Sequence, residues 1–266
     1  MKRSISAKFN ELRASGSKAL IPYLTCGYPS IRRFVDFAQV VEDSGANLLE
    51  IGLPHSDPMA DGPTIRYTSH QALSHGLNLE RAFESIRRVA DKTSIPLIAM
   101  CYVNTILKRG IDRFAKDCED SGISGVIVPD LIYEERQSIL RSLKRKHIDL
   151  VFLAAPTTPQ NRLRQIASAS SGFLYLVSVT GITGARKILP TETERFIRKA
   201  RTLAPIPMCV GFGVSSGELA NRMGSISDGV IVGSAILDRI RKARNNGDSV
   251  RSVASFMKQL RKGLDT

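Results

Sequence analysis

Apolar residues along this chain gather in short runs, and longer amphipathic segments separate the runs. Within a run the residues do not alternate between apolar and polar, so both faces of each predicted strand should be buried. Continuous apolar strands of this kind are typical of a parallel sheet that is covered by helices. The runs lie at residues 19–25, 47–52, 96–102, 125–130, 150–155, 173–178, 207–212 and 229–234.

The segments between the runs have the periodicity of amphipathic helices. In residues 31–45, one helical face carries Phe34, Phe37, Val40 and Val41. Several such segments end on glycine or on basic residues, which suit the C-terminus of a helix. The other segments with this pattern are residues 79–92, 111–122, 133–147 and 191–204.

The number of strand and helix units predicts the architecture. Eight predicted strands, each followed by a helix, fit an α/β fold of the (β/α)8 TIM-barrel type, which typically has about 250 residues. A doubly wound sheet usually has fewer strands and a switch point in their order. Because no linker or low-complexity stretch interrupts the chain, we predict a single barrel domain over residues 1–266. An extra helix should precede the first strand at residues 5–14, and another should follow the last unit at residues 248–262.

The chain is strongly basic, with a formal net charge of +13 over 266 residues. A nucleic-acid partner would account for such a charge. However, the lysines and arginines are scattered over the predicted helices, and no stripe pairs them with the stacking aromatics that single-strand binders use. We therefore expect no nucleic-acid partner and interpret the charge as that of solvated helix faces.

The cysteines and the N-terminal segment bear on the cellular compartment. Cys26, Cys101, Cys118 and Cys209 lie far apart and form no CxxC pair, and three of them fall within apolar runs, as buried thiols do. Neither disulfides nor a metal site is therefore expected. The N-terminus has no apolar signal core, and no apolar run approaches the ~20 residues of a membrane span. We expect a cytoplasmic protein with no membrane partner.

Carboxylates stand at the end of the second predicted strand and in the turn-rich loop after it: the strand ends at Glu50, and the loop carries Asp57 and Asp61. In a barrel of this type the active site lies at the C-terminal ends of the strands. Glu50 would face a partly apolar interior, where desolvation raises the pKa of a carboxyl group. Asp61, in the loop, should be wetter and stay ionised, so the pair could divide acid and base roles. An internal ion pair for Glu50 and simple turn formation for Asp61 and Asp57 are the alternatives.

Glycines and serines follow the predicted strands seven and eight. Gly213 and Gly233 would let backbone N–H groups approach an anion closely. Ser215, Ser216 and Ser234 stand where helices should begin, and helix N-termini bind phosphate. The GITGAR segment at residues 181–186 could close over the same anion. The alternative is that these glycines only form tight turns, but three converging loops favour a phosphate site.

Aromatic side chains complete the chemistry of the strand ends. Tyr102 and Tyr175 could pack against an aromatic ligand and donate a hydrogen bond, although a plain core role fits Tyr102 equally well. His55 has no visible partner in the sequence, so we expect a surface or interface role for it. The remaining histidines have no metal-ligand spacing.

Taken together, these motifs resemble those of the tryptophan synthase alpha subunit family, and the resemblance spans nearly the whole chain. The most specific segment is LEIGLPHSDPMADGPTIR at residues 49–66. The matches continue in order with PYLTCGYP, MCYVNTILKRGIDRF, GVIVPDL, VTGITGAR after Tyr175, VGFGVSS and DGVIVGSAI.

The resemblance implies a carbon–carbon lyase that cleaves indole-3-glycerol phosphate, by a retro-aldol reaction, to indole and glyceraldehyde 3-phosphate. It implies no cofactor in this subunit. It also implies a partner, a pyridoxal-phosphate-dependent beta subunit that joins the indole to serine in tryptophan biosynthesis. The assembly implied is an αββα heterotetramer.

Roles for individual residues also follow from the resemblance. Glu50 matches the glutamate that moves protons at indole C3 and at the glycerol hydroxyl, and Asp61 matches the aspartate that interacts with the indole N–H. Tyr175 matches a tyrosine near the substrate glycerol, and Thr183 matches the threonine of the family's closing loop, which contacts the catalytic aspartate. The phosphate-contacting positions are Gly184, Gly213, Gly233 and Ser234, and the segments that face the beta subunit contain Pro54, Asp57 and Asn104.

Some positions depart from the family pattern. His55 stands where phenylalanine is usual, Arg66 where glutamine is common, Gln71 where arginine is frequent and Ile132 where proline is usual. None of these changes removes a catalytic group. The alternatives are a catalytically silent subunit that only activates a beta partner, a stand-alone indole-releasing lyase, and another barrel enzyme acting on sugar phosphates. A Schiff-base aldolase is not favoured, because no predicted strand ends in lysine.

Overall fold

The computed structural model describes residues 3–177, 191–211 and 213–266. Within these ranges, parallel strands form one nine-stranded sheet with the order β5-β4-β3-β2-β1-β9-β8-β7-β6. The strands are β1 (Ala19–Thr25), β2 (Leu49–Gly52), β3 (Leu97–Met100), β4 (Ile123–Ile127), β5 (Asp149–Val151), β6 (Leu153–Ala154), β7 (Leu174–Val177), β8 (Met208–Gly211) and β9 (Gly229–Val232).

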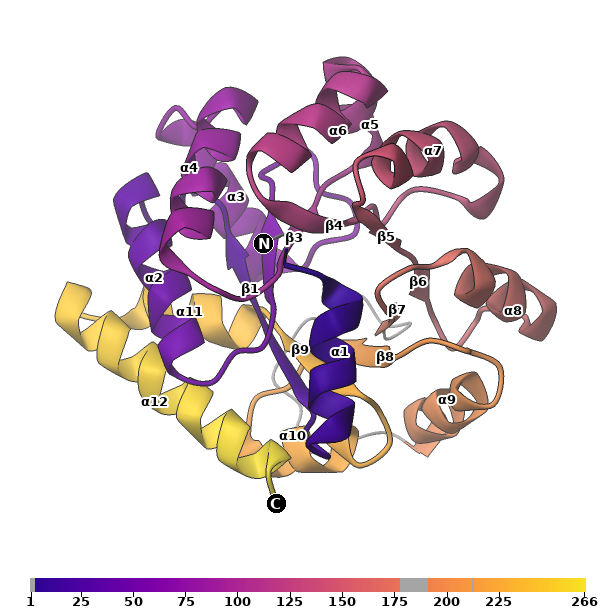
Figure 1. Ribbon diagram of the computed structural model, residues 1–266. Helices are drawn as coiled ribbons and strands as arrows, with labels where there is room; N and C mark the ends of the chain where they lie inside the picture. Colours follow the sequence, from indigo (N-terminus) through magenta and orange to yellow (C-terminus); the bar gives the residue numbers. More distant parts are fainter. Residues whose placement is uncertain (1–2, 178–190, 212) are drawn as a thin grey trace.

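The sheet curls into a barrel, so the predicted (β/α)8 fold is confirmed (Figure 1). The two ends of the strand order, β5 and β6, are consecutive in the chain and are separated only by Phe152. The predicted strand at residues 150–155 is therefore interrupted, and the sheet closes there through the chain itself. Several other strands are shorter than predicted. The run at 125–130, for example, ends as β4 at Ile127, before Pro129, which has no N–H for a ladder.

Helices surround the barrel, and those predicted by periodicity are present (Figure 1). The five segments read from sequence correspond to α2 (Ile31–Asp43), α4 (Leu79–Lys92), α6 (Ile111–Asp120), α7 (Gln137–Arg145) preceded by the 3-10 turn Tyr133–Glu135, and α9 (Thr191–Arg201). The helix at the C-terminus is α12 (Asn246–Leu264). The remaining helices are α3 (Pro63–Ser74), α5 (Val103–Arg109), α8 (Gln160–Ala169), α10 (Gly217–Gly224) and α11 (Ser234–Lys242).

The N-terminal helix α1 (Ile5–Ala14) lies over one end of the barrel (Figure 1). It has the bounds expected from the sequence, and the Ser4 side chain caps it by accepting from the Ala7 N–H. Its buried side chains Ile5, Phe9 and Leu12 join one apolar cluster with inward-facing side chains of the strands. This cluster closes the N-terminal end of the barrel, which directs any active site to the opposite end.

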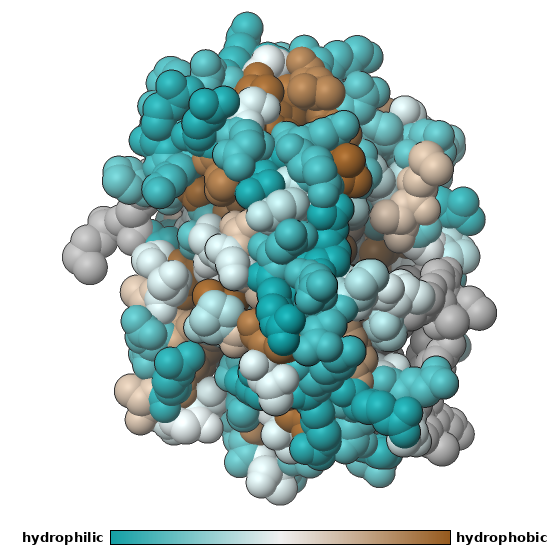
Figure 2. Space-filling model, turned by 90° about the vertical axis from the view of Figure 1, so that its right-hand side faces the viewer, coloured by the Kyte–Doolittle hydropathy of each residue, from teal (hydrophilic) through white to brown (hydrophobic). Residues whose placement is uncertain are grey.

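A second and larger apolar cluster fills the space between the strands and the surrounding helices. In α2, Phe34, Phe37 and Val41 are buried and Val40 packs against the cluster, as the sequence pattern predicted. Over α7–α9 the outer surface is mostly hydrophilic (Figure 2), which agrees with helices that bury one face only. Among the described residues, no helix is long and apolar enough to cross a membrane.

Candidate active site

Glu50 lies in β2, where its position in the sheet aligns with Tyr23 of β1 and Ile98 of β3. Its side chain is 1% exposed, and its Oε2 atom has no hydrogen-bond partner. Burial raises the pKa of Glu50 to about 8, and the negative charge of Asp61 adds to the shift. The sequence-based expectation that desolvation raises this pKa is confirmed. At neutral pH Glu50 is therefore mostly a neutral acid that retains a transferable proton.

Asp61 lies in the loop between β2 and α3, directly before Gly62, which precedes the helix. The loop brings its half-buried carboxyl group close enough to Glu50 for the two charges to interact. Burial raises the pKa of Asp61 to about 6, whereas the Tyr102 hydrogen bond and the positive charge of Arg66 lower it. The Asp61 carboxyl group is more buried than the sequence suggested, yet it is mostly ionised at pH 7, as predicted.

Tyr102 forms hydrogen bonds both with Asp61 and with the backbone of the loop that carries Asp61. The Tyr102 hydroxyl donates a hydrogen bond to Asp61 Oδ2 (3.1 Å) and accepts one from the Ala60 backbone N–H (3.0 Å). Its side chain is buried, and burial together with the Asp61 charge raises the pKa of the phenol well above its ordinary value. The hydroxyl therefore stays protonated and acts as a donor. Tyr102 is therefore bonded to a candidate catalytic group, and its contact with a ligand stays a prediction.

Two further tyrosines face the same end of the barrel interior. Tyr175 lies in β7, aligned with Cys209 of β8, and a Cβ on Gly211 would approach its hydroxyl oxygen to 2.6 Å. Tyr23 of β1 is related to Gly52 in the same way, because a Cβ there would overlap the Tyr23 hydroxyl. Burial raises the pKa of both phenols, and the charges of Glu50 and Asp61 add to the effect.

Sequence analysis did not single out Tyr23 as a site residue. The sequence did contain a signal for it, because a tyrosine in one strand is accompanied by a glycine in the neighbouring strand. That glycine leaves room for the tyrosine hydroxyl group. Gly52 and Gly211 thus serve a packing purpose, because they leave room for two phenol groups that lie close enough to Glu50 to interact with its charge.

The candidate phosphate residues lie after β8 and β9, which are neighbours in the sheet. Ser216 caps α10 by accepting from the Leu219 N–H, and Ser234 is the first residue of α11, so both predicted helix N-termini exist. Gly213 has a φ of +62°, a conformation that favours glycine. Phosphate binding by Gly213, Gly233 and Ser234 stays a prediction. Thr183 and Gly184 lie outside the described residues.

The candidate partner residues lie on the loops and helices that follow β2 and β3. Asp57 and Asn104 are exposed, and Pro54 is half-buried. Large apolar side chains are also exposed after β2, β3 and β4, namely Met59, Leu107 and Ile132. Their exposed fractions are 88%, 56% and 51%, which is unusual for side chains of this type and marks this rim as a candidate contact surface.

His55, for which the sequence offered no partner, has two in the structure. Its Nδ1 accepts a hydrogen bond from the Asp57 backbone N–H (3.1 Å), and its ring lies 5.0 Å from the Tyr102 ring, measured between centroids. It therefore belongs to the same group of contacts as Asp61.

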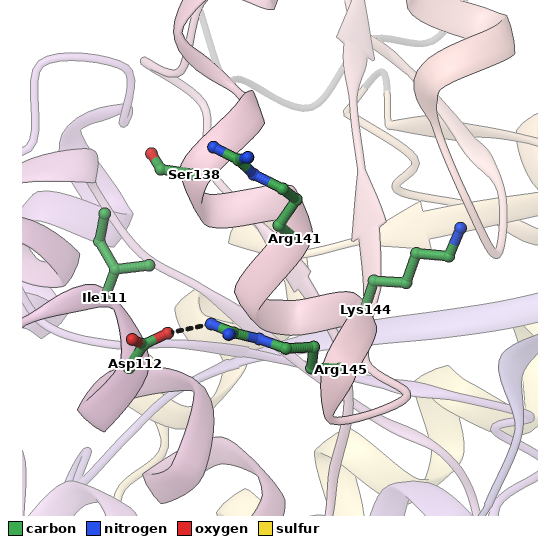
Figure 3. A pocket seen from close by; sticks show the side chains of 6 residues that line it. All are labelled: Ile111, Asp112, Ser138, Arg141, Lys144 and Arg145. Carbon is green, nitrogen blue, oxygen red and sulfur yellow. Dashed lines mark hydrogen bonds and ion pairs between the residues drawn. The ribbon is translucent and has the colours of Figure 1, made fainter.

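A groove on the outside of the barrel does not contain the candidate residues. Figure 3 shows a groove between α6 and α7, lined by Asp112, Arg141, Lys144 and Arg145 among others. It lies outside the barrel, and its one carboxylate is bound by Arg145 and Ser142. In the described part of the chain, no cluster of three or more His, Cys, Asp or Glu side chains could hold a metal ion. The four cysteines are buried free thiols.

Comparison with known proteins was made by sequence and by structure. The family model for the tryptophan synthase alpha chain matches residues 9–265. The tryptophan synthase alpha chain of Caldanaerobacter subterraneus subsp. tengcongensis is 38% identical over 260 residues, which cover 98% of this chain and 99% of that relative. The corresponding protein of Methanocaldococcus jannaschii is 40% identical over 253 residues, or 95% of this chain and 90% of the relative.

Solved structures agree with this assignment. Tryptophan synthase of Mycobacterium tuberculosis superposes with a TM-score of 0.92 at 31% identity, and the match covers 100% of both chains. The alpha subunit from Legionella pneumophila str. Paris gives 0.91 at 30% identity, covering 100% of this chain and 99% of that one. On the combined grounds of sequence, fold and site, this chain belongs to the tryptophan synthase alpha chain family.

Proposed function

We propose that this chain is the alpha subunit of tryptophan synthase and that it cleaves indole-3-glycerol phosphate to indole and glyceraldehyde 3-phosphate. The observation that carries the proposal is the pair of carboxyl groups at one end of the barrel. Glu50 has a pKa of about 8 and Asp61 one of about 6, so near neutral pH one is mostly an acid and the other mostly a base. Two carboxyl groups in different environments can divide acid and base roles.

The retro-aldol reaction needs both states. Glu50 gives its proton to indole C3, which turns the ring into its indolenine form. Asp61 accepts a hydrogen bond from the ring N–H and stabilises the positive character that develops there. The resulting Glu50 carboxylate then removes the glycerol hydroxyl proton. A carbonyl forms, and the electrons of the breaking carbon–carbon bond return to the ring as indole.

Surrounding residues would position the substrate. Tyr102 and Tyr175 offer ring faces and hydroxyl donors beside the two carboxyl groups, which suits an indole ring attached to a glycerol chain. In this proposal Gly213, Gly233 and Ser234 hold the phosphate at the N-termini that follow β8 and β9, and Thr183 and Gly184 complete the site. No cofactor is assigned to this subunit.

An alpha chain of tryptophan synthase implies a beta-subunit partner. We place that partner on the rim that carries Pro54, Asp57 and Asn104, and the exposed side chains of Met59 and Leu107 support this choice. The finer proposal is an αββα complex in which the beta subunit uses pyridoxal phosphate to join indole to serine. Buried free thiols are consistent with a reducing, cytoplasmic location.

The test is indole release from indole-3-glycerol phosphate, measured with and without a beta subunit. Glu50→Gln and Asp61→Asn should each lower kcat by about 10²–10⁴-fold, the usual range for general acid–base groups. Glu84→Gln, at an exposed carboxylate of α4 that is paired with Arg88, is the matched control.

Each alternative function gives a distinct result in this experiment. Release that is already fast without a partner would favour a stand-alone lyase. No release in any condition, while the beta reaction is still stimulated, would refute the lyase and leave a regulatory subunit.

A further inference from the structure

His55 makes two contacts that restrict its ring. The Asp57 backbone N–H donates to Nδ1 at 3.1 Å. Because a backbone N–H can only donate, Nδ1 carries no hydrogen in this arrangement, and the neutral ring bears its hydrogen on Nε2. The ring plane is tilted by 44° to that of Tyr102, with the centroids 5.0 Å apart. This separation is within the range of favourable aromatic pairs.

Tyr102 transmits this restriction to Asp61. Its ring contacts His55 on one side, and its hydroxyl is held between the Ala60 N–H (3.0 Å) and Asp61 Oδ2 (3.1 Å). A phenol with the ring packed and the oxygen bonded twice has little freedom to rotate. The orientation of the Asp61 carboxylate therefore depends on the position of the His55 ring.

We infer that His55 is a positioning residue. It holds the Tyr102 ring against the loop, and Tyr102 in turn directs the Asp61 carboxylate toward the substrate. This inference rests on the function proposed above, because it assigns a purpose to the orientation of Asp61. It differs from the sequence-based expectation of a surface or interface role for His55.

Electrostatics around Asp61 agree with the geometry. The Tyr102 hydrogen bond is the largest contribution that lowers the pKa of Asp61, and the positive charge of Arg66 adds to it. Glu50 and Tyr23 also face the group and interact with its charge. Loss of the hydrogen bond from Tyr102 should therefore raise the pKa of Asp61. A measurement of this pKa thus reports whether the hydrogen bond is present.

The experiment compares His55→Ala, which removes the ring, with Tyr102→Phe, which removes the hydroxyl, and with the double variant. His55→Phe keeps a ring but loses the bond to Asp57. His70→Ala changes an exposed histidine of α3 and is the matched control. Two quantities are measured: kcat and KM for indole release, and the Asp61 pKa from ¹³C NMR of labelled aspartate, assigned with Asp61→Asn. Thermal unfolding establishes that each variant is folded.

Tyr102→Phe and His55→Ala should each lower kcat at least about tenfold, as misplaced catalytic groups do, with KM changed less than about twofold. Both should raise the Asp61 pKa. Since the residues act through one set of contacts, the double variant should be no worse than Tyr102→Phe alone. His55→Phe should fall between the wild type and His55→Ala, and His70→Ala should match the wild type.

The inference is overturned if folded His55→Ala retains the wild-type kcat and Asp61 pKa, or if the double variant shows additive losses. It is also overturned if His55→Phe is as impaired as His55→Ala, because the ring contact would then be irrelevant. A wild-type chain that released no indole would refute the proposed function instead, and the NMR comparison would still decide the role of His55.

Discussion

The two ends of the barrel have opposite chemistry. At the N-terminal end, Phe9 and Leu12 of α1 seal the interior together with side chains such as Ile21 and Leu48. At the other end the interior holds Glu50, with the hydroxyls of Tyr23 and Tyr175 nearby. The same strands supply both environments, since Leu48 and Glu50 are only two residues apart.

This difference shows how the fold sets the pKa of Glu50. Inward-facing residues alternate along a strand, so a step of two residues moves one layer along the barrel axis. Glu50 lies in the interior one layer beyond this cluster, and its buried Oε2 has no partner. Its own burial, together with the charge of Asp61, raises its pKa.

The largest effect should be on the pH dependence of stability. The folded-state pKa of Glu50 is about 8 and its ordinary value is 4.5, so the folded state binds this proton more tightly than the unfolded state. The cost of ionising Glu50 is absent below pH 4.5 and grows until about pH 8, where it reaches on the order of 5 kcal/mol.

Urea unfolding at pH 5–9 checks this prediction. The wild-type free energy of unfolding should fall with rising pH relative to that of Glu50→Gln, which has no such group to ionise. Parallel curves for the two proteins would contradict it.

At the sealed end, Phe9→Ala should destabilise the protein by about 3–5 kcal/mol, because the cavity lies within a closed apolar cluster. Indole release per folded molecule should stay within about twofold of wild type, since kcat depends on the other end. Lys8→Ala removes an exposed ion pair of the same helix and should cost less than about 1 kcal/mol. A large loss of kcat in folded Phe9→Ala would mean that the two ends are coupled more tightly than we infer.

Gly52→Ala should cost about 1–3 kcal/mol, because the added methyl group overlaps the Tyr23 hydroxyl. Displacement of that phenol should also raise KM, which steady-state kinetics would detect. Gly247→Ala is the control, since a Cβ there approaches its nearest neighbour, Arg251, only to 3.4 Å. Equal behaviour of the two alanine variants would remove the packing argument for Gly52.

The smallest effect on stability is expected at the exposed rim. Met59→Ser should change the free energy of unfolding by less than about 0.5 kcal/mol, because 88% of this side chain is exposed. Affinity for a beta subunit, measured by titration calorimetry, should nevertheless fall, whereas Ser252→Ala, at an exposed position of α12, should leave it unchanged. Unaltered affinity of Met59→Ser would place the partner elsewhere.

Much of the fold could be predicted because its causes are local. Apolar runs and helical periodicity determine which segments form strands and helices, and α1 was expected at the residues where it occurs. Strand ends were predicted less well. The run at 96–102 ends as β3 at Met100, and Tyr102 already precedes α5. Sequence periodicity does not indicate the residue at which the backbone leaves the sheet and enters a helix.

For the site, the sequence by itself determined that Glu50 would lie in a buried strand and that Asp61 would follow in a loop, since these depend on apolar patterning and turn residues. The strand was expected to end at Glu50, but β2 continues to Gly52. Tertiary structure alone decided that Asp61 is partly shielded from water, that Tyr102 donates a hydrogen bond to it, and that His55 packs on Tyr102. The physical reason is distance along the chain. Asp61 and Tyr102 are 41 residues apart, and only the parallel pairing of β2 with β3 brings the segments after these two strands together.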